Sequence, residues 1–176
     1  MTCGYRQARK GTGKMKDRVF GELDYDYGFV GKISIDFFGD TEEIDIIIQA
    51  DDEEDGIADI QYAAYEAFKA KWNDIQNDIA EKIIEYYNNE EKGAYGPDDE
   101  EEFREWWPDI ESRADLLPLI HIDSVIIPND YLMGDGRKVY VLFDRDWGGQ
   151  DLEDNGVAVG LVDEAVEEVG YKDIAL

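Results

Sequence analysis

One stretch of the chain, residues 59–89, constrains the fold most because it contains neither glycine nor proline. Its large apolar residues recur every three or four positions, which places them on one stripe of an α-helix. The stripe comprises Tyr65, Phe68, Trp72, Ile75, Ile79, Ile83 and Tyr86. At about 1.5 Å per residue the helix would be about 45 Å long. Such a stripe needs a broad apolar surface to cover.

Strands are predicted on both sides of this helix from period-two alternation and β-branched runs. Before the helix we expect strands at 19–23, 30–38 and 44–48. After it we expect a short acidic helix at 98–106 and a further helical turn that Ser112 caps. The last strands are predicted at 119–127, 138–146, 156–162 and 165–171.

Strands that are grouped at the two ends of a chain, rather than alternating with helices, are typical of an α+β fold. We therefore predict a largely antiparallel sheet, with three N-terminal and about four C-terminal strands, packed against one long central helix. A chain of 176 residues with 43% hydrophobic residues is sufficient for one domain with its own core.

Residues 1–14 differ from the rest of the chain in charge. They contain Arg6, Arg9, Lys10 and Lys14 but no acid. We expect residues 1–14 to be a flexible leader or a remnant of an expression tag, and residues 15–176 to form the single α+β domain. A basic arm with a function of its own is the alternative.

The net charge of −27 at pH 7 restricts the partners of this chain. Nucleic acid and anionic membrane surfaces would be repelled. The charge is compatible with high solubility alone, with a basic protein partner, or with imitation of a nucleic acid. Cys3 is the only cysteine, which fits a reducing compartment. With no apolar signal region and no apolar stretch of about 18 residues, we expect a cytoplasmic protein.

No residue pattern in the chain predicts a metal site or a catalytic set. The loops that begin at Asp51 and Asp151 imitate a calcium loop, but their twelfth positions hold Tyr62 and Val162 instead of an acid. His121 is the only histidine, which argues against a multi-histidine metal site and a nucleophilic triad. We predict no cofactor and no enzymatic activity. A carboxylate-based enzyme is the remote alternative, because acids are too frequent for any pair to stand out.

Three groups of residues are candidates for binding a partner. The first is the acidic run before the long helix, Asp51, Asp52, Glu53, Glu54 and Asp55. The second is the pair Trp106 and Trp107, because adjacent tryptophans on a helix cannot both face one core and an exposed ring among acids can anchor a basic protein. The third follows the strand at 138–146 and comprises Asp144, Asp146, Trp147 and Asp151. The structural alternatives are a solvated acidic run, tryptophans that seal the core and acids that cap a turn.

Several motifs link the chain to a known family. The long helix contains Gln61, Ala64, Tyr65, Phe68 and the ending Ile84-Glu85-Tyr86-Tyr87. Trp107-Pro108-Asp109-Ile110 and the stretch 116–126 follow, and the closing motif at 166–176 is the most specific. Over residues 28–176 the chain resembles a family of small acidic bacterial proteins of unknown molecular activity. Such families look like the immunity proteins found beside polymorphic or contact-dependent toxins.

This resemblance implies binding and blocking of a toxin rather than catalysis. The family usually has a compact Trp-Asp-acid-acid-His-Gly turn after its second late strand. Here Trp147 begins a longer loop without histidine, at 147–156, so any role of that histidine is absent and partner choice can differ at this loop. The sequence thus favours a non-catalytic acidic inhibitor, an immunity protein that neutralises a cognate basic toxin domain. The alternative is a nucleic-acid mimic that blocks a DNA-binding enzyme, which requires carboxylates spaced like phosphates along one surface.

Overall fold

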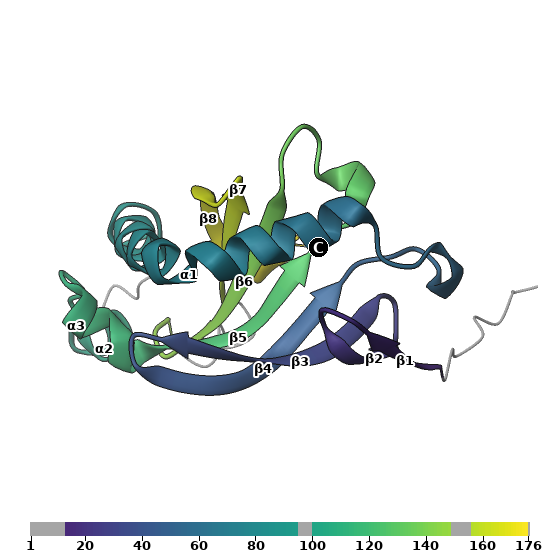
Figure 1. Cartoon of the computed structure of the whole chain (residues 1–176). Coiled ribbons are helices and arrows are strands. Elements are labelled where there is room, and N and C mark those ends of the chain that lie inside the picture. The colour runs from purple at the N-terminus through teal and green to yellow at the C-terminus, as the bar shows by residue number, and fades with distance from the viewer. Residues whose placement is uncertain (1–12, 95–99, 149–155, 176) are drawn as a thin grey trace, which may run out of the picture.

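The protein is built on one eight-stranded sheet and one long helix (Figure 1). The computed structural model describes residues 13–94, 100–148 and 156–175. The strands lie side by side in chain order: β1 (Lys14–Asp17), β2 (Gly21–Tyr25), β3 (Phe29–Phe37), β4 (Asp40–Ile48), β5 (Ile120–Ile127), β6 (Lys138–Arg145), β7 (Val157–Val162) and β8 (Ala165–Tyr171). All neighbours pair antiparallel except β4 and β5, which are parallel. The predicted α+β class is confirmed.

The long crossover between β4 and β5 contains most of the helical structure. It consists of η1 (Glu53–Asp55), α1 (Asp59–Tyr86), a π-helical turn η2 (Tyr87–Glu91), α2 (Glu100–Trp106), α3 (Arg113–Leu116) and η3 (Leu117–Leu119). Ser112 caps α3 as predicted, because its side chain accepts from Asp115 N. In the described part of the chain, two short 3₁₀ turns lie outside the crossover, η4 (Asp130–Leu132) and η6 (Lys172–Ala175).

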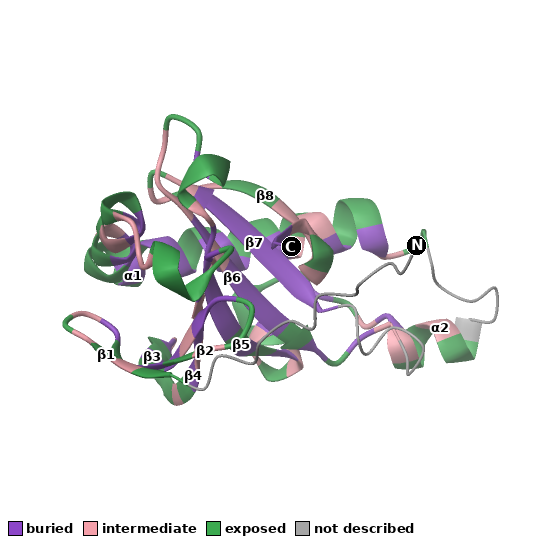
Figure 2. Cartoon of the chain, turned by 90° about the vertical axis from the view of Figure 1, so that its right-hand side faces the viewer, coloured by how far each residue is buried: buried purple, intermediate pink, exposed green. Residues whose placement is uncertain are grey.

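Helix α1 covers one face of the sheet through the predicted stripe. Six of its seven members are buried: Tyr65, Phe68, Trp72, Ile75, Ile79 and Ile83. Tyr86 is half-buried, and Tyr87, the first residue of the π turn, is fully buried instead. The sheet twists so that β3 and β4 pass below α1 while β7 and β8 stand behind it (Figure 1). Figure 2 shows that β7, the strand next to the β8 edge, is buried along almost its whole length.

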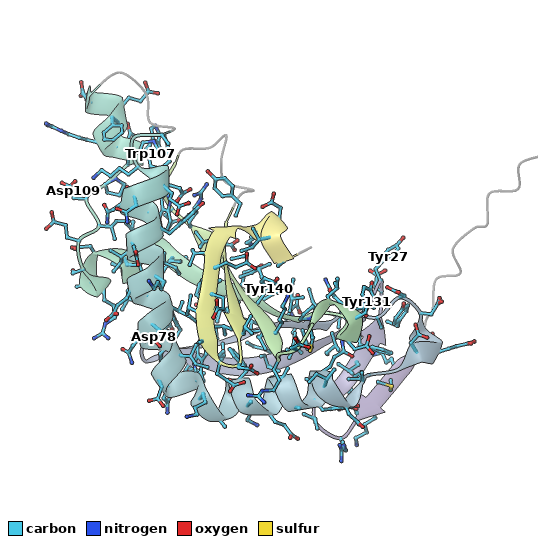
Figure 3. The ribbon with its side chains drawn as sticks, turned by 90° about the horizontal axis from the view of Figure 1, so that it is seen from above. Tyr27, Asp78, Trp107, Asp109, Tyr131 and Tyr140 are labelled. Atoms are coloured by element: carbon cyan, nitrogen blue, oxygen red, sulfur yellow. The ribbon has the colours of Figure 1, made fainter. Side chains whose placement is uncertain are left out.

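The axis of α1 changes direction near Asp78 (Figure 3). Just before this point the Asn77 side chain donates from Nδ2 to the Asn73 carbonyl oxygen, at 3.2 Å. A side chain that bonds to the carbonyl four residues earlier competes with the helical ladder and bends the helix. Arg113 of α3 donates to Asn77 Oδ1 at 2.9 Å on the outer side of the bend. The bend lets the second half of α1 follow the twisted sheet toward β8.

The opposite face of the sheet is covered only in part. A small second cluster forms there from Ile126, Leu142, Ala158 and Ala175. Ala175 belongs to η6, so the end of the chain folds back over this face. Elsewhere the face is polar, as the exposed ion pair between Lys32 and Asp45 illustrates, with Nζ and Oδ1 2.7 Å apart.

The N-terminal boundary of the fold lies slightly earlier than the sequence predicted. Lys14, which was assigned to the leader, is the first residue of β1 and pairs with Asp24. The strand was missed because it is short and polar. Its end is tied to α1, since Asp17 Oδ2 accepts from the Tyr62 hydroxyl at 2.6 Å. Asp17 Oδ1 accepts from the Phe20 amide at 2.9 Å and so stabilises the turn to β2. Of the other leader residues, Gly13 is exposed, and residues 1–12 lie outside the described residues.

Replacement of Trp72 tests the packing of α1 on the sheet. The side chain is 7% exposed, its Nε1 donates to the Asp36 carbonyl, and its ring lies 5.1 Å from that of Phe68. Trp72→Ala should therefore reduce the free energy of unfolding by about 3–5 kcal/mol. Urea denaturation measures this change. The matched control is Lys71→Ala on the exposed face, which should stay within about 0.5 kcal/mol; a cost below about 1 kcal/mol for Trp72→Ala would contradict the packing.

Candidate functional site

The acidic run lies between β4 and the start of α1. All five of its residues are exposed, and three of them form η1. The run folds on itself, because Asp55 Oδ2 accepts from the Asp52 amide at 3.2 Å, and the chain leaves the turn at Gly56 with φ 67°. A short local turn thus presents five carboxylates to solvent. None of them contributes to the core.

Two exposed tyrosines lie at the same end of the molecule as the acidic run (Figure 3). Tyr27, in the β2–β3 turn, is 86% exposed, and Tyr131, in η4, is 64% exposed. Asp51 connects the run to η4, since its Oδ1 accepts from Asn129 Nδ2 at 3.0 Å and from the Tyr131 hydroxyl at 3.2 Å. We call this surface the acidic end. It comprises Tyr27, Asp51, Asp52, Glu53, Glu54, Asp55 and Tyr131.

Tyr27 is unusual in conformation as well as in exposure. Its φ of 57° lies in the left-handed region, which glycine and asparagine adopt at lower cost than a bulky residue. With 86% of its surface exposed, its ring gains little from packing. Neither the turn nor the core explains a tyrosine at this position. Strained residues of this kind are concentrated at functional sites.

The acidic end also produces a local negative potential. The pKa of Tyr25 is raised, first by burial and then by the nearby charges of Asp52, Asp55, Asp51 and Glu53. The Tyr25 hydroxyl donates to the Ala50 carbonyl at 3.2 Å, which places the phenol beside the beginning of the run. A partner that brings lysine or arginine to this surface would be attracted.

Two of the three tryptophans expected at a binding surface lie in the core instead. Trp107 and Trp147 are each 2% exposed, so neither ring is available to a partner, and the prediction is corrected for both. Their rings lie 6.2 and 5.2 Å from that of Tyr87, which the π turn directs inward. Trp106 is half-buried against the same core, as expected for one member of an adjacent pair.

A buried ion pair lies beside these tryptophans. Arg145 Nη1 binds Glu91 Oε1, and both side chains are almost inaccessible, at 0% and 1% exposed. Trp147 Nε1 donates to the other Glu91 oxygen at 2.9 Å, and the guanidinium lies over the rings of Trp147 and Tyr171. Burial lowers the pKa of Arg145. Sequence reasoning missed this pair, because only the π turn reveals that Glu91 faces inward.

Asp144 and Asp146, from the third predicted group, lie on the opposite face of the sheet from α1. Asp144 is exposed and accepts from Lys172 Nζ at 2.6 Å, and the same ammonium donates to Asp123 at 3.1 Å. Asp146 Oδ2 lies 3.7 Å from His121 Nε2. The two Lys172 contacts hold η6 to the sheet. Asp151 lies outside the described residues.

The structure does not bring the three predicted groups together at one site. The acidic run lies at the start of α1, the tryptophans near its end, and Asp144 and Asp146 beneath the sheet. Within residues 13–94, 100–148 and 156–175, no three histidine, cysteine or acidic side chains are grouped so that they could hold a metal ion. The exposed tyrosines were not predicted. The only signal for Tyr27 was an aromatic residue directly before the turn glycine Gly28.

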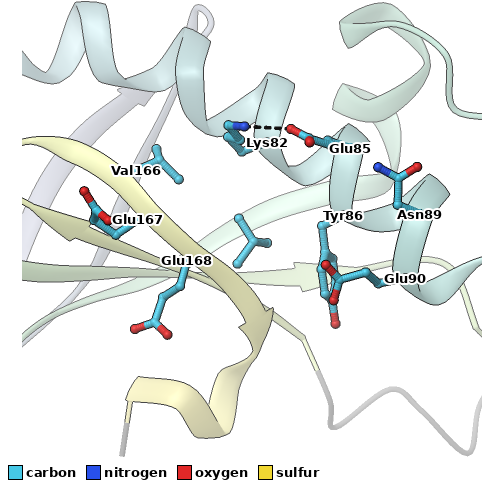
Figure 4. Close-up of a pocket in the computed structure, with 9 residues that line it drawn as sticks. Lys82, Glu85, Tyr86, Asn89, Glu90, Val166, Glu167 and Glu168 are labelled. Atoms are coloured by element: carbon cyan, nitrogen blue, oxygen red, sulfur yellow. Dashed lines mark hydrogen bonds and ion pairs between the residues drawn. The ribbon is translucent and has the colours of Figure 1, made fainter.

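A second acidic surface lies between the last part of α1 and β8 (Figure 4). It is a groove of about 220 Å³, below the usual 300–1,000 Å³ of small-molecule pockets. We call it the α1–β8 groove. Its acidic residues are Glu85, Glu90, Glu167 and Glu168. Its one lysine, Lys82, is already paired with Glu85 at 2.7 Å.

A comparison with protein-family models assigns the sequence to a family. A family model described as "Domain of unknown function (DUF6985)" matches residues 19–176. The chain belongs to this family. The DUF6985 match includes α1 and every strand from β2 onward, but its description names no activity and therefore does not support the resemblance to immunity proteins. Searches of curated proteins and of solved structures found no match. In the part of the chain that the structure describes, no helix has the length and apolarity to span a membrane.

The buried ion pair provides a test of the core at this end of α1. Arg145→Met leaves the Glu91 carboxylate buried without its cation, which should cost about 3–5 kcal/mol of stability in urea denaturation. The double variant Glu91→Leu/Arg145→Met should recover much of this loss, because apolar residues replace both charges. A remaining deficit of about 1–3 kcal/mol is expected, because Trp147 Nε1 loses its acceptor. A small effect of Arg145→Met alone, below about 1 kcal/mol, would mean that water reaches Glu91.

Proposed function

We propose that this chain is a non-catalytic inhibitor of the immunity type, which binds a basic toxin domain through the acidic end. The observation that carries the proposal is the position of two exposed tyrosines, Tyr27 and Tyr131, beside five exposed carboxylates. Tyrosine is among the residues that contribute most to binding energy at protein interfaces. Carboxylates around it attract lysine and arginine and accelerate the encounter.

The two kinds of residue have different roles in this proposal. The tyrosine rings bury apolar area and offer π-faces to cations, so they slow dissociation once the complex has formed. The acids act before contact, because their field extends about 8 Å at physiological ionic strength. The hydrogen bonds that Asp51 accepts from Asn129 and Tyr131 hold the Tyr131 ring in place before a partner arrives. Such preorganisation lowers the entropic cost of binding.

The distribution of acids favours a protein partner over the imitation of a nucleic acid. A mimic needs carboxylates in a row on one surface, comparable with the phosphates of a nucleic-acid strand, which recur once per about 3.4 Å of helix axis. Exposed acids here lie on unrelated surfaces: Asp52 in the acidic end, Asp74 on the outer face of α1, Glu43 on the opposite face of the sheet and Glu168 on β8. Among the described residues, this spread supports solubility and long-range attraction rather than one phosphate-like row.

Surface plasmon resonance against the toxin domain encoded beside this chain tests the proposal. Association should slow by more than about tenfold between 50 and 300 mM salt, because the acids are screened. Reversal of Asp51, Asp52, Glu53 and Glu54 to lysine should lower the association rate. Tyr27→Ala and Tyr131→Ala should mainly raise the dissociation rate, about tenfold or more.

Asp74→Lys/Asp78→Lys, on the outer face of α1, is the control variant for non-specific charge. It should change the association rate by less than about twofold. In cells, co-expression of the unaltered chain should rescue growth in the presence of the toxin domain, and the tyrosine variants should rescue less. Salt-independent association, or tyrosine variants that bind like the unaltered chain, would refute the acidic end as the contact surface.

A further inference from the structure

Strand β8 leaves one edge of the sheet open at the α1–β8 groove. It is the last strand in the sheet order and pairs only with β7. Within the described residues, no other strand lies beyond it. No described strand therefore pairs with the N–H and C=O groups of residues 165–170 that point away from β7. An exposed edge of this kind is a template for a strand from another chain.

The sequence of β8 determines which strand can pair with it. Glu168 pairs with Gly160 and Val166 with Leu161, so Glu167 is the extra residue of a bulge. Both glutamates are exposed. A second copy of β8 would place glutamates against glutamates, which is unfavourable. A basic strand would meet opposite charges instead.

The helix side of the groove also favours a basic segment over an acidic one. Glu85 of α1 and Glu90 of η2 line the helix side of the groove, and Val166 and Val169 contribute half-buried apolar surface on its strand side (Figure 4). A segment that alternates basic and apolar residues would present its two kinds of side chain to opposite sides. Its cations would lie near the glutamates and its apolar side chains near the valines.

The other edge of the sheet, at β1, carries lysines where β8 carries glutamates. Strand β1 carries Lys14 and Lys16, which would repel a basic segment. It also lies far in the sheet order from the α1–β8 groove. The two edges are thus distinguishable by charge, and of the two edges formed by the described residues it is β8 that lies beside an acidic groove.

We infer that β8 accepts an extended basic segment of a partner protein as a ninth strand, and that residues of the α1–β8 groove contact the side chains of this segment. This inference goes beyond the proposed function and does not depend on it, because it uses neither the acidic run nor the exposed tyrosines. The proposed function can fail while β8 still binds such a segment, and the reverse also holds.

A synthetic peptide of about seven alternating lysine and valine residues, acetylated and amidated, is a suitable probe. Amide hydrogen exchange and NMR shifts of the full chain should show that the peptide protects outward-facing amides within 165–171. The same peptide with every second backbone nitrogen methylated keeps its charge but cannot form the ladder on one edge, so it should bind at least about tenfold more weakly. A glutamate–valine peptide should not bind.

Two charge-reversed variants separate the groove from general attraction. Glu167→Lys/Glu168→Lys should weaken peptide binding by about tenfold or more, whereas Asp74→Lys/Asp78→Lys, with the same change in net charge, should weaken it by less than about threefold. Unchanged circular dichroism and melting would establish that both variants are folded. Equal losses in both variants, equal binding of the methylated peptide, or protection outside 165–171 would each overturn the inference. Self-association through β8, seen as a dimer in light scattering that the peptide does not dissociate, would overturn it as well.

Discussion

One parallel pairing, between β4 and β5, determines how the rest of this protein is arranged. Antiparallel neighbours can be joined by tight turns, but parallel neighbours need a long crossover that passes over one face of the sheet. Here the crossover contains α1, and the apolar stripe of the helix lies on the buried side of β4, at Ile44, Ile46 and Ile48. The strands on either side extend as antiparallel ribbons. The same constraint places β1 and β8 at the two edges and leaves one face of the sheet with little cover.

Much of this architecture is visible in the sequence because its signals are local and repeated. The stripe of α1 has a regular period, Ser112 is a strong cap, and the later strands are separated by turn residues. The errors occur where the signal is short or irregular. Strand β1 has only four residues, and the π turn after Tyr86 shifts the buried side by one residue, so that Tyr87 is directed inward.

Candidate binding surfaces were harder to predict than the fold, because composition does not show which side of an element is exposed. Trp107 and Trp147 have the residue type of interface anchors, yet their neighbours in space enclose them. Tyr27 and Tyr131 were overlooked because both occur in turns, where aromatic residues carry no periodic signal. The acidic run was recognised as exposed, but its contact with η4 through Asp51 depends on a tertiary hydrogen bond that sequence spacing cannot reveal.

The end of the chain influences how firmly the last strand is held. An edge strand with a single neighbour tends to fray, since local opening costs little where few contacts are lost. Tyr171, at the end of β8, lies 5.2 Å from the Arg145 guanidinium on one face, and η6 fastens the other face through Lys172 and the buried Ala175. Opening of β8 would thus break contacts on both faces at once. Strand β8 should therefore resist fraying, although it has only one neighbouring strand. Its backbone groups on the open side then keep the regular spacing of a strand.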